Sequence, residues 1–516
     1  MLSIFASGTL SFDKIDDRCA NDNRYGNTLV QICATFKNAE TEIKERVVRV
    51  EACWLRIGMQ LDFVRRIAQI LDEHHQLIHC ETLRVISSKL EIVVTKLESV
   101  VGKKTIGGSS QQEEWQFKRV KYVVVKESID KAIEDLKTWQ DVFDPTWYLI
   151  MKAATPQVDL ELARVTNNFS RVSLSSVESL RTALKSNRPT GSPIFLPEDG
   201  LERIRELEIP FSSATLGQRS DSVKTVVLER ITCPPHTDIA ILTRDIRDLA
   251  RKLSHSNPAI FGLLNCKGVV KHLPDESQSP PTFTFVFRIP NEFREPRSLR
   301  SCLLEQNLHH SLSDRFKLAC DLAKAISYVH TFGFVHKNVR PETILIFKTA
   351  ESTIGSVSLV GFENFRTAEG RTLHSGDTSW EKNLYRHPRR QGLKPGDVYV
   401  FQHDIYSLGV CLLELGLWDS FVTYDESRTI VSPSIVLGLP TDLLETGDIS
   451  VTKDHLVSLA RVLLPRCMGN KYAEIVETCL TCLDENNTDF GDEHEFADSD
   501  GIQVGVRYVE KVTLIE

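Results

Sequence analysis

The chain has 516 residues, of which 41% are hydrophobic and 26% are charged, and its formal net charge is −8. These values are ordinary for a soluble protein of two or three domains, and the negative charge argues against nucleic acid as a general partner. Residues 484–500 hold eight acids and neither Lys nor Arg, so an acidic, solvated loop is expected there. Twelve scattered cysteines and the lack of a long apolar run favour a cytoplasmic protein with reduced thiols.

Apolar residues recur at helical spacing along the N-terminal region, residues 1–153. This spacing predicts an antiparallel bundle of four or more helices, and therefore an all-α domain. On periodicity alone, such a bundle is structural or serves oligomerisation. The expected helices cover residues 29–47, 50–71, 83–97 and 122–136, and a flexible stretch, "GGSSQQ", lies at 107–112.

The next region, residues 154–205, is rich in Ser, Asn and Pro, which predicts a linker. From residue 206 the pattern becomes mixed. Strands are expected at 223–232, 261–270 and 282–290, with a helix at 238–255 whose apolar face includes Ile241, Ile246, Leu249 and Leu253. Another helix is expected to begin with Ser313 as its N-cap and to stop at Gly333. Strands followed by helices predict an α+β domain with a small sheet lobe and a larger helical lobe.

Four stretches of residues 206–516 occur in an order that carries a resemblance. They are "HKNVRPET" at 336–343, "SLVGFENF" at 358–365, "YRHP" at 385–388 and "HDIYSLGVCLLELGLW" at 403–418. In this order and at these separations they resemble the catalytic loop, the D-F-G segment, the A-P-E segment and the central helix of protein kinases. The resemblance implies a bilobal kinase-like fold, in which the scaffold positions are His336, Lys337, Pro388, Asp404 and Gly409.

The same resemblance implies that the catalytic positions are degenerate. The catalytic Asp is matched by Asn338, the metal-binding Asn by Thr343 and the D-F-G Asp by Gly361, while Glu229 stands for the phosphate-binding Lys and Asp245 for its acidic partner. An amide cannot act as a general base, and two facing acids would repel phosphate. The segment matched to the Gly-rich loop, "FSSATLGQRSDS", has one glycine, Gly217. We therefore expect no catalysis, no cofactor, and at most weak ATP binding with little dependence on Mg²⁺.

The N-terminal region resembles, through "FASGTLSFDKIDDRC", "VEACWLRIGMQLDFVRRI" and "KTWQDVFDPTWYLI", the HeLo-like and prion-inhibition-and-propagation-like domains of fungal incompatibility proteins. Joined to a degenerate kinase domain, this plan is similar to that of mixed-lineage kinase domain-like proteins. The resemblance implies a switch in programmed cell death, with protein partners, possible homo-oligomers and conditional recruitment to a membrane. The start, "MLSIFASGTLSF", departs from a long membrane-seeking helix.

The sequence is also compatible with two other functions. A divergent active kinase could use Glu363 or an acid elsewhere for phosphoryl transfer. An adaptor or scaffold without membrane action would need only the surfaces of the two domains.

Overall fold

The computed structural model comprises two compact units, residues 1–171 and 172–516. In the first unit the structure describes residues 46, 48–50, 53, 73–105, 113–117, 121–122 and 124–136. In the second it describes residues 194–487 except 203, 220–224, 234–237, 273–279, 306–309, 350–352, 368–377, 393–397 and 447–448. Most of the helices expected at 29–47 and 50–71, most of the linker expected at 154–205 and most of the acidic loop 484–500 thus lie outside the described residues.

The first unit contains two of the predicted helices. Helix α3 spans Glu73–Ser99 and buries Ile86 and Val93 completely, as the apolar spacing predicts. Residues 121–122 and 124–136 are also helical, and Ile129 is buried there. The Lys96 Nζ of α3 donates to the carbonyl oxygen of Ser128 at 2.9 Å, which joins the two helices.

The prediction that this unit is all-α is wrong at one place. Strands β1 (Val101–Thr105) and β2 (Glu113–Phe117) form an antiparallel hairpin around the "GGSSQQ" stretch. In the register, Val101 stands opposite Phe117 and Thr105 opposite Glu113. A glycine-containing connection between two short segments favours a hairpin, which helical periodicity in the flanking sequence concealed.

The sheet lobe of the second unit is built on one six-stranded sheet of order β3-β7-β8-β6-β5-β4. Neighbouring strands are antiparallel except β3 and β7, which are parallel. The strands expected from the sequence are present as β6, β7 and β8. The bounds are β3 Phe195–Leu196, β4 Ile204–Glu208, β5 Thr215–Arg219, β6 Thr225–Thr232, β7 Asn265–His272 and β8 Thr282–Arg288.

The sheet reaches into residues that the sequence assigned to the linker, so the predicted boundary at 206 is wrong. Strand β3, the 3-10 helix η3 (Glu198–Leu201) and the start of β4 all precede it. The physical reason is the apolar content of this short stretch. Leu196, Leu201 and Ile204 pack against buried residues of the sheet, which a Ser- and Pro-rich average does not reveal.

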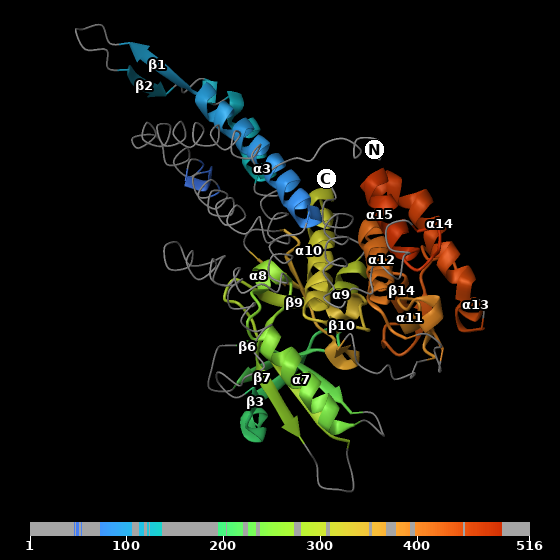
Figure 1. Ribbon diagram of the computed structural model, residues 1–516. Coiled ribbons are helices and arrows are strands. Elements are labelled where there is room, and N and C mark those ends of the chain that lie inside the picture. Colours follow the sequence, from blue (N-terminus) through green and yellow to red (C-terminus); the bar gives the residue numbers. More distant parts are fainter. Residues whose placement is uncertain are drawn as a thin grey trace. The chain divides into compact units, whose positions relative to one another are not determined.

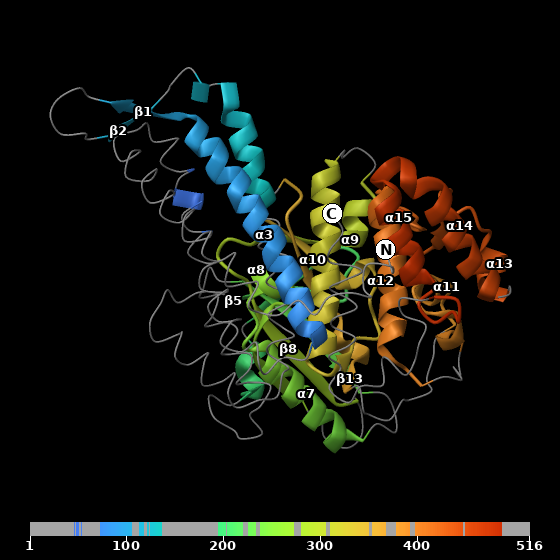
Figure 2. The same cartoon turned by 45° about the horizontal axis from the view of Figure 1, so that its top comes forward.

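Helix α7 (Ile239–Leu253) packs against β7, and Figure 2 shows it running along the sheet lobe. Its N-cap is Asp238, whose carboxylate accepts from the backbone N–H groups of the first turn at 2.9 and 3.0 Å. Ile246, Leu249 and Leu253 are buried as predicted, whereas Ile241 is 50% exposed and does not belong to the buried face. A short helix, α8 (Pro258–Phe261), follows.

The helical lobe surrounds α12 (Phe401–Leu417), most of whose residues are buried and which contacts α10, α14 and α15 (Figure 1). Helix α10 (Leu312–Thr331) begins at the N-cap Ser311, not at Ser313, because the Ser311 Oγ accepts from the Asp314 N–H at 3.1 Å. The other helices are α9 Leu299–Leu303, α11 Trp380–Asn383, α13 Thr441–Thr446, α14 Ile449–Met468 and α15 Asn470–Leu480, with 3-10 helices η4 Pro341–Thr343, η5 Phe362–Asn364 and η6 Pro388–Arg390.

Further short strands form small sheets outside the six-stranded one. A three-stranded sheet has the order β12-β11-β9, while β10 pairs with β13 and β14 with β15. Their bounds are β9 Arg294–Ser298, β10 Phe334–Val335, β11 Ile344–Lys348, β12 Ser356–Leu359, β13 Arg366–Thr367, β14 Val422–Tyr424 and β15 Val431–Pro433. Among the described residues, no helix combines the length and the apolar character that a bilayer crossing needs.

Candidate functional site

Asp404 of α12 holds the loop between β10 and η4 in place through hydrogen bonds. Its carboxylate accepts from the backbone N–H groups of His336 and Lys337 at 2.7 and 2.9 Å and from the Tyr399 hydroxyl at 2.6 Å. Burial alone would raise the pKa of Asp404, but hydrogen bonds from His330 and Tyr399 outweigh it and lower the pKa to about 2. The fully buried carboxylate is therefore a fixed anion that sets the shape of the loop.

His336 is a packed, neutral histidine. Its Nε2–H donates to the carbonyl of Val360 at 3.0 Å and its Nδ1 accepts from the Asn338 N–H at 3.3 Å, which fixes the tautomer. Its ring lies 4.9 Å from that of Phe362. Burial lowers the pKa of His336 to about 4, so the imidazole stays uncharged at neutral pH. It serves the fold and is no proton acceptor near pH 7.

The other three predicted scaffold residues, Lys337, Pro388 and Gly409, also have defined positions in the fold. The backbone of Lys337 is left-handed, and its ammonium lies 5.6 Å from the centre of the Tyr399 ring. Pro388 opens η6. Gly409 of α12 lies so close to α15 that a Cβ there would be 2.9 Å from the Cys479 Cβ. These contacts give each of the three residues a place in the packing of the helical lobe.

Asn338, at the position of the catalytic Asp, is a hydrogen-bond bridge. Its Nδ2 donates to the Glu363 carboxylate at 2.9 Å and to the Gly361 carbonyl at 3.3 Å, while its Oδ1 accepts from the Arg340 Nε at 3.0 Å. The reversed amide would point an oxygen at two acceptors, so only this orientation fits. The site requires a donor at residue 338, which a carboxylate is not.

We therefore expect Asn338→Asp, which restores the kinase residue, to destabilise the second unit by about 1–3 kcal/mol at pH 7. The new carboxylate would face the Glu363 carboxylate and the Gly361 carbonyl without a donor between them. Urea denaturation followed by intrinsic fluorescence measures the loss. In the double variant Asn338→Asp/Glu363→Gln, the amide introduced at position 363 can donate to the carboxylate introduced at position 338, so most of the loss should be recovered. Equal losses in the single and double variants would contradict this account.

The two metal-binding positions of the resemblance, Gly361 and Thr343, are packed against each other. Gly361 has a φ of 90°, in the left-handed region, and a Cβ there would lie 2.6 Å from the Thr343 Cβ. The Thr343 Oγ1 donates to the Asn338 carbonyl at 2.7 Å, which anchors this side chain in place. No group of three or more His, Cys, Asp or Glu residues that could hold a metal ion occurs in the described part of the chain.

Glu229 of β6, at the position of the phosphate-binding Lys, reaches across to the same segment. It is 2% exposed, and its Oε2 accepts from the Gly361 N–H at 3.0 Å. Burial raises the pKa of Glu229 to about 8, with a further upward effect from Glu363. Asp245 accepts instead from its neighbour Arg244 at 3.2 Å. The two carboxyls thus accept hydrogen bonds from separate partners.

Replacing Glu229 by Gln should remove a pH dependence of stability. Below pH 4.5 the carboxyl is protonated whether the chain is folded or not, whereas between pH 4.5 and 8 the unfolded chain loses the proton and the folded one keeps it. Stability therefore falls as pH rises through this window, by at most about 5 kcal/mol. Melting temperatures at pH 5 and pH 8 should differ less for Glu229→Gln than for the natural chain. The exposed substitution Glu202→Gln should leave the difference unchanged, and an equal effect of both would refute the assignment.

The turn between β4 and β5 is fastened to the helical lobe, a feature the sequence did not predict. The Ser298 Oγ donates to the carbonyl of Pro210 at 2.6 Å, and the Phe211 ring lies 4.8 Å from that of Tyr424. The Arg428 guanidinium lies 4.6 Å from the centre of the Phe211 ring and 3.7 Å from Glu208. This turn stands where the resemblance places a Gly-rich loop, and the aromatic Phe211 was the signal that could have indicated a closed turn.

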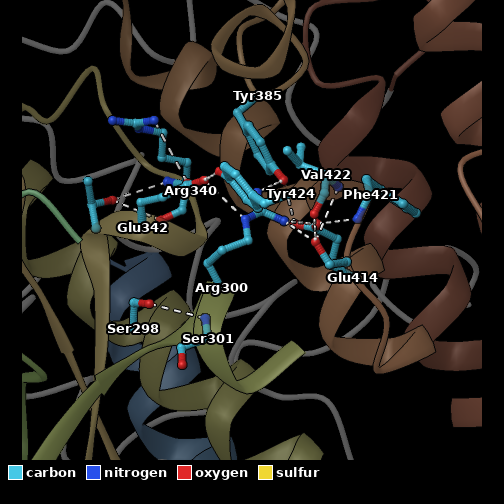
Figure 3. A network of polar contacts seen from close by, with 12 residues as sticks. Ser298, Arg300, Ser301, Arg340, Glu342, Tyr385, Glu414, Phe421, Val422 and Tyr424 are labelled. Carbon is cyan, nitrogen blue, oxygen red and sulfur yellow. Dashed lines mark hydrogen bonds and ion pairs between the residues drawn. The ribbon is translucent and has the colours of Figure 1, made fainter. Parts of the chain in front are cut away.

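The sequence also did not predict a buried ionic network that is centred on Arg300 (Figure 3). Arg300 of α9, fully buried, donates to Glu342 of η4 at 3.0 Å and to Glu414 of α12 at 2.8 Å. The Tyr385 hydroxyl donates to Glu414 at 2.8 Å. Burial would raise the pKa of Glu342, but Arg300 and Arg340 lower it; burial does raise the pKa of Glu414. A charged residue inside the apolar run "SLRSCLL" was its only sequence signal.

No protein-family model matches this chain. It is 27% identical over 163 residues to a probable serine/threonine-protein kinase of Dictyostelium discoideum, covering 31% of this chain and 9% of that protein. It is 27% identical over 193 residues to a protein kinase and PP2C-like domain-containing protein of Arabidopsis thaliana, covering 36% and 28%. A dual specificity protein kinase of Schizosaccharomyces pombe is 25% identical over 133 residues, covering 23% and 19%.

These relatives, together with the sheet lobe and the helical lobe, support a protein-kinase-like domain in the second unit. The chain spans less than a third of the length of each of these relatives, so the similarity concerns this domain alone. Within the second unit, four of the residues at the matched positions, Asn338, Thr343, Gly361 and Glu229, contact one another.

Proposed function

We propose that this chain is a catalytically inactive signalling protein, whose kinase-like domain acts as a protein-binding switch. The observation that carries the proposal is the contact of Gly361 with Thr343 beneath the Asn338 bridge. Phosphoryl transfer by a kinase needs a carboxylate base and a carboxylate that holds Mg²⁺. Here the first position donates hydrogen bonds to Glu363 and Gly361, and the second has no side chain and no space for one.

The alternative of a divergent active kinase would need an acid from elsewhere. Glu363 is one candidate, but its carboxylate accepts from Asn338 at 2.9 Å. Glu229 stays protonated at neutral pH because it is buried, so it attracts neither a metal nor a substrate proton. The fastened β4–β5 turn adds a third obstacle, since it would have to open before a nucleotide could bind beneath it.

The test is a thermal-shift titration of the full chain with ATP, with and without Mg²⁺, together with a radiolabelled phosphate-transfer assay. We expect a small shift that does not depend on Mg²⁺, and no transfer. A metal-dependent stabilisation of about 4 kcal/mol, as expected when the ligand exceeds its Kd about 1,000-fold, would refute the proposal. So would phosphate transfer that is lost in Glu363→Gln.

For the first unit we propose oligomerisation or membrane-directed signalling, in the manner of cell-death incompatibility proteins, once a protein partner engages the kinase-like domain. The support is the resemblance of the N-terminal sequence and the apolar stripe buried along α3. Leakage of dye from anionic liposomes and sedimentation of the full chain test the proposal. If the chain neither self-associates nor permeabilises liposomes but still captures a partner, an adaptor without membrane action is the correct function.

A further inference from the structure

The six-stranded sheet has a second apolar face besides the one that forms the domain core. Leu228 of β6, Val270 of β7 and Val286 of β8 form a cluster, and each is only 3% exposed. The residues packed against this cluster are Leu196, Leu201, Ile204 and Val226. Leu196 and Leu201 belong to the segment 194–201, which precedes β4 and lies over the cluster. Without this segment, much of the cluster would face water.

The backbone of the segment is held by the edge of β7. The Val269 N–H donates to the Ile194 carbonyl at 2.9 Å, and β3 then pairs in parallel with β7, Phe195 beside Val269 and Leu196 beside Val270. Gly268 makes the close approach possible, since a Cβ there would lie 2.6 Å from the Ile194 carbonyl oxygen and 2.8 Å from the Leu196 Cγ. The edge of β7 next to Gly268 therefore accommodates an extended backbone in close contact.

Two side chains add specificity at the ends of the segment. The Arg247 guanidinium of α7 lies 5.3 Å from the centre of the Phe195 ring. His272, the last residue of β7, contacts the carboxylate of Glu198. The surface thus recognises an apolar Ile-Phe-Leu run followed by a proline and an acidic turn, with an aromatic contact at one end and an acid contact at the other.

We propose that this face, formed by the β7 edge, the Leu228 cluster and Arg247, is a peptide-docking surface whose ligand is the segment 194–201, bound here in cis and exchangeable with that of a second copy of the chain. Only two residues of the segment pair as a strand, so leaving the edge breaks few hydrogen bonds. Departure uncovers the apolar cluster, and the same segment of another molecule has the matching shape and chemistry. The inference does not depend on whether the chain transfers phosphate.

The test uses the full chain carrying Leu196→Asp, which weakens its own segment, and a fluorescein-labelled peptide with the natural sequence of residues 192–202. We expect the peptide to bind this variant at least about tenfold more tightly than the natural chain, whose own segment competes, a difference of about 1.4 kcal/mol. The added substitution Gly268→Val should abolish binding. A peptide that carries Leu196→Asp is the matched control and should not bind.

Hydrogen exchange gives a local readout that does not depend on how well Gly268→Val folds. The Val269 amide should be protected in the natural chain, exposed in Leu196→Asp and protected again when the peptide is added. The milder variant Leu196→Ala serves if Leu196→Asp lowers the melting temperature of the whole domain. The proposal is overturned if the peptide fails to bind either variant at about 1 mM, or if it protects amides outside β7 and leaves Val269 exposed.

Discussion

Gly361→Asp, which restores the metal-binding residue of kinases, is expected to destabilise the kinase-like domain by about 3 kcal/mol or more, and to confer no dependence of ATP binding on Mg²⁺. The φ of 90° disfavours any side chain, and a Cβ would lie 2.6 Å from the Thr343 Cβ. The Glu229 carboxyl, whose Oε2 accepts from the Gly361 N–H, would also face a new negative charge nearby. Urea denaturation and an ATP thermal-shift titration measure the two outcomes.

Gly361→Ala is the control that separates shape from charge. It adds the same Cβ and the same backbone strain but no carboxylate, so it should already cause most of the loss of stability. If Gly361→Asp were as stable as the natural chain and its melting temperature rose with ATP only when Mg²⁺ is present, the closed metal position described above would be wrong.

Arg300→Met should lower the free energy of unfolding by about 3–5 kcal/mol, because it leaves buried carboxylates without their cation. Glu414 is fully buried and Glu342 nearly so, and Arg300 donates to both (Figure 3). The loss should appear as a lower denaturation midpoint. It should also loosen the hairpin after α12, since the Phe421 N–H donates to Glu414 at 2.7 Å.

The matched control removes the charges together with the cation. In Arg300→Met/Glu342→Gln/Glu414→Gln no buried charge is left unpaired, and much of the stability should return. Arg300→Lys keeps the charge but not the planar fork that reaches two carboxylates, so an intermediate loss is expected. A loss below about 1 kcal/mol for Arg300→Met would show that the network contributes little to the fold.

The order of strands and helices in the second unit could be predicted because it follows from local periodicity. The β-branched run around Glu229 forms β6, and α7 carries its apolar stripe at Ile246 and Leu249, so both elements form where expected. Short elements could not be predicted this way. The two residues of β3 form because they pair with β7, which lies far along the chain and outside any short window of sequence. The hairpin β1–β2 is local, but the helical periodicity of the flanking sequence concealed it.

The candidate site shows the same division. By itself, the sequence determined which residue types stand at the matched catalytic positions: an amide at 338, a glycine at 361 and an acid at 229. Only the tertiary structure decided what these residues do, because their partners lie far away along the chain. Asn338 bridges to Glu363, Gly361 makes room for Thr343, and Glu229 bonds the Gly361 N–H across 132 positions. Local preferences act over a few residues, whereas hydrogen bonds and steric fit in a buried site act between whichever groups the fold brings together.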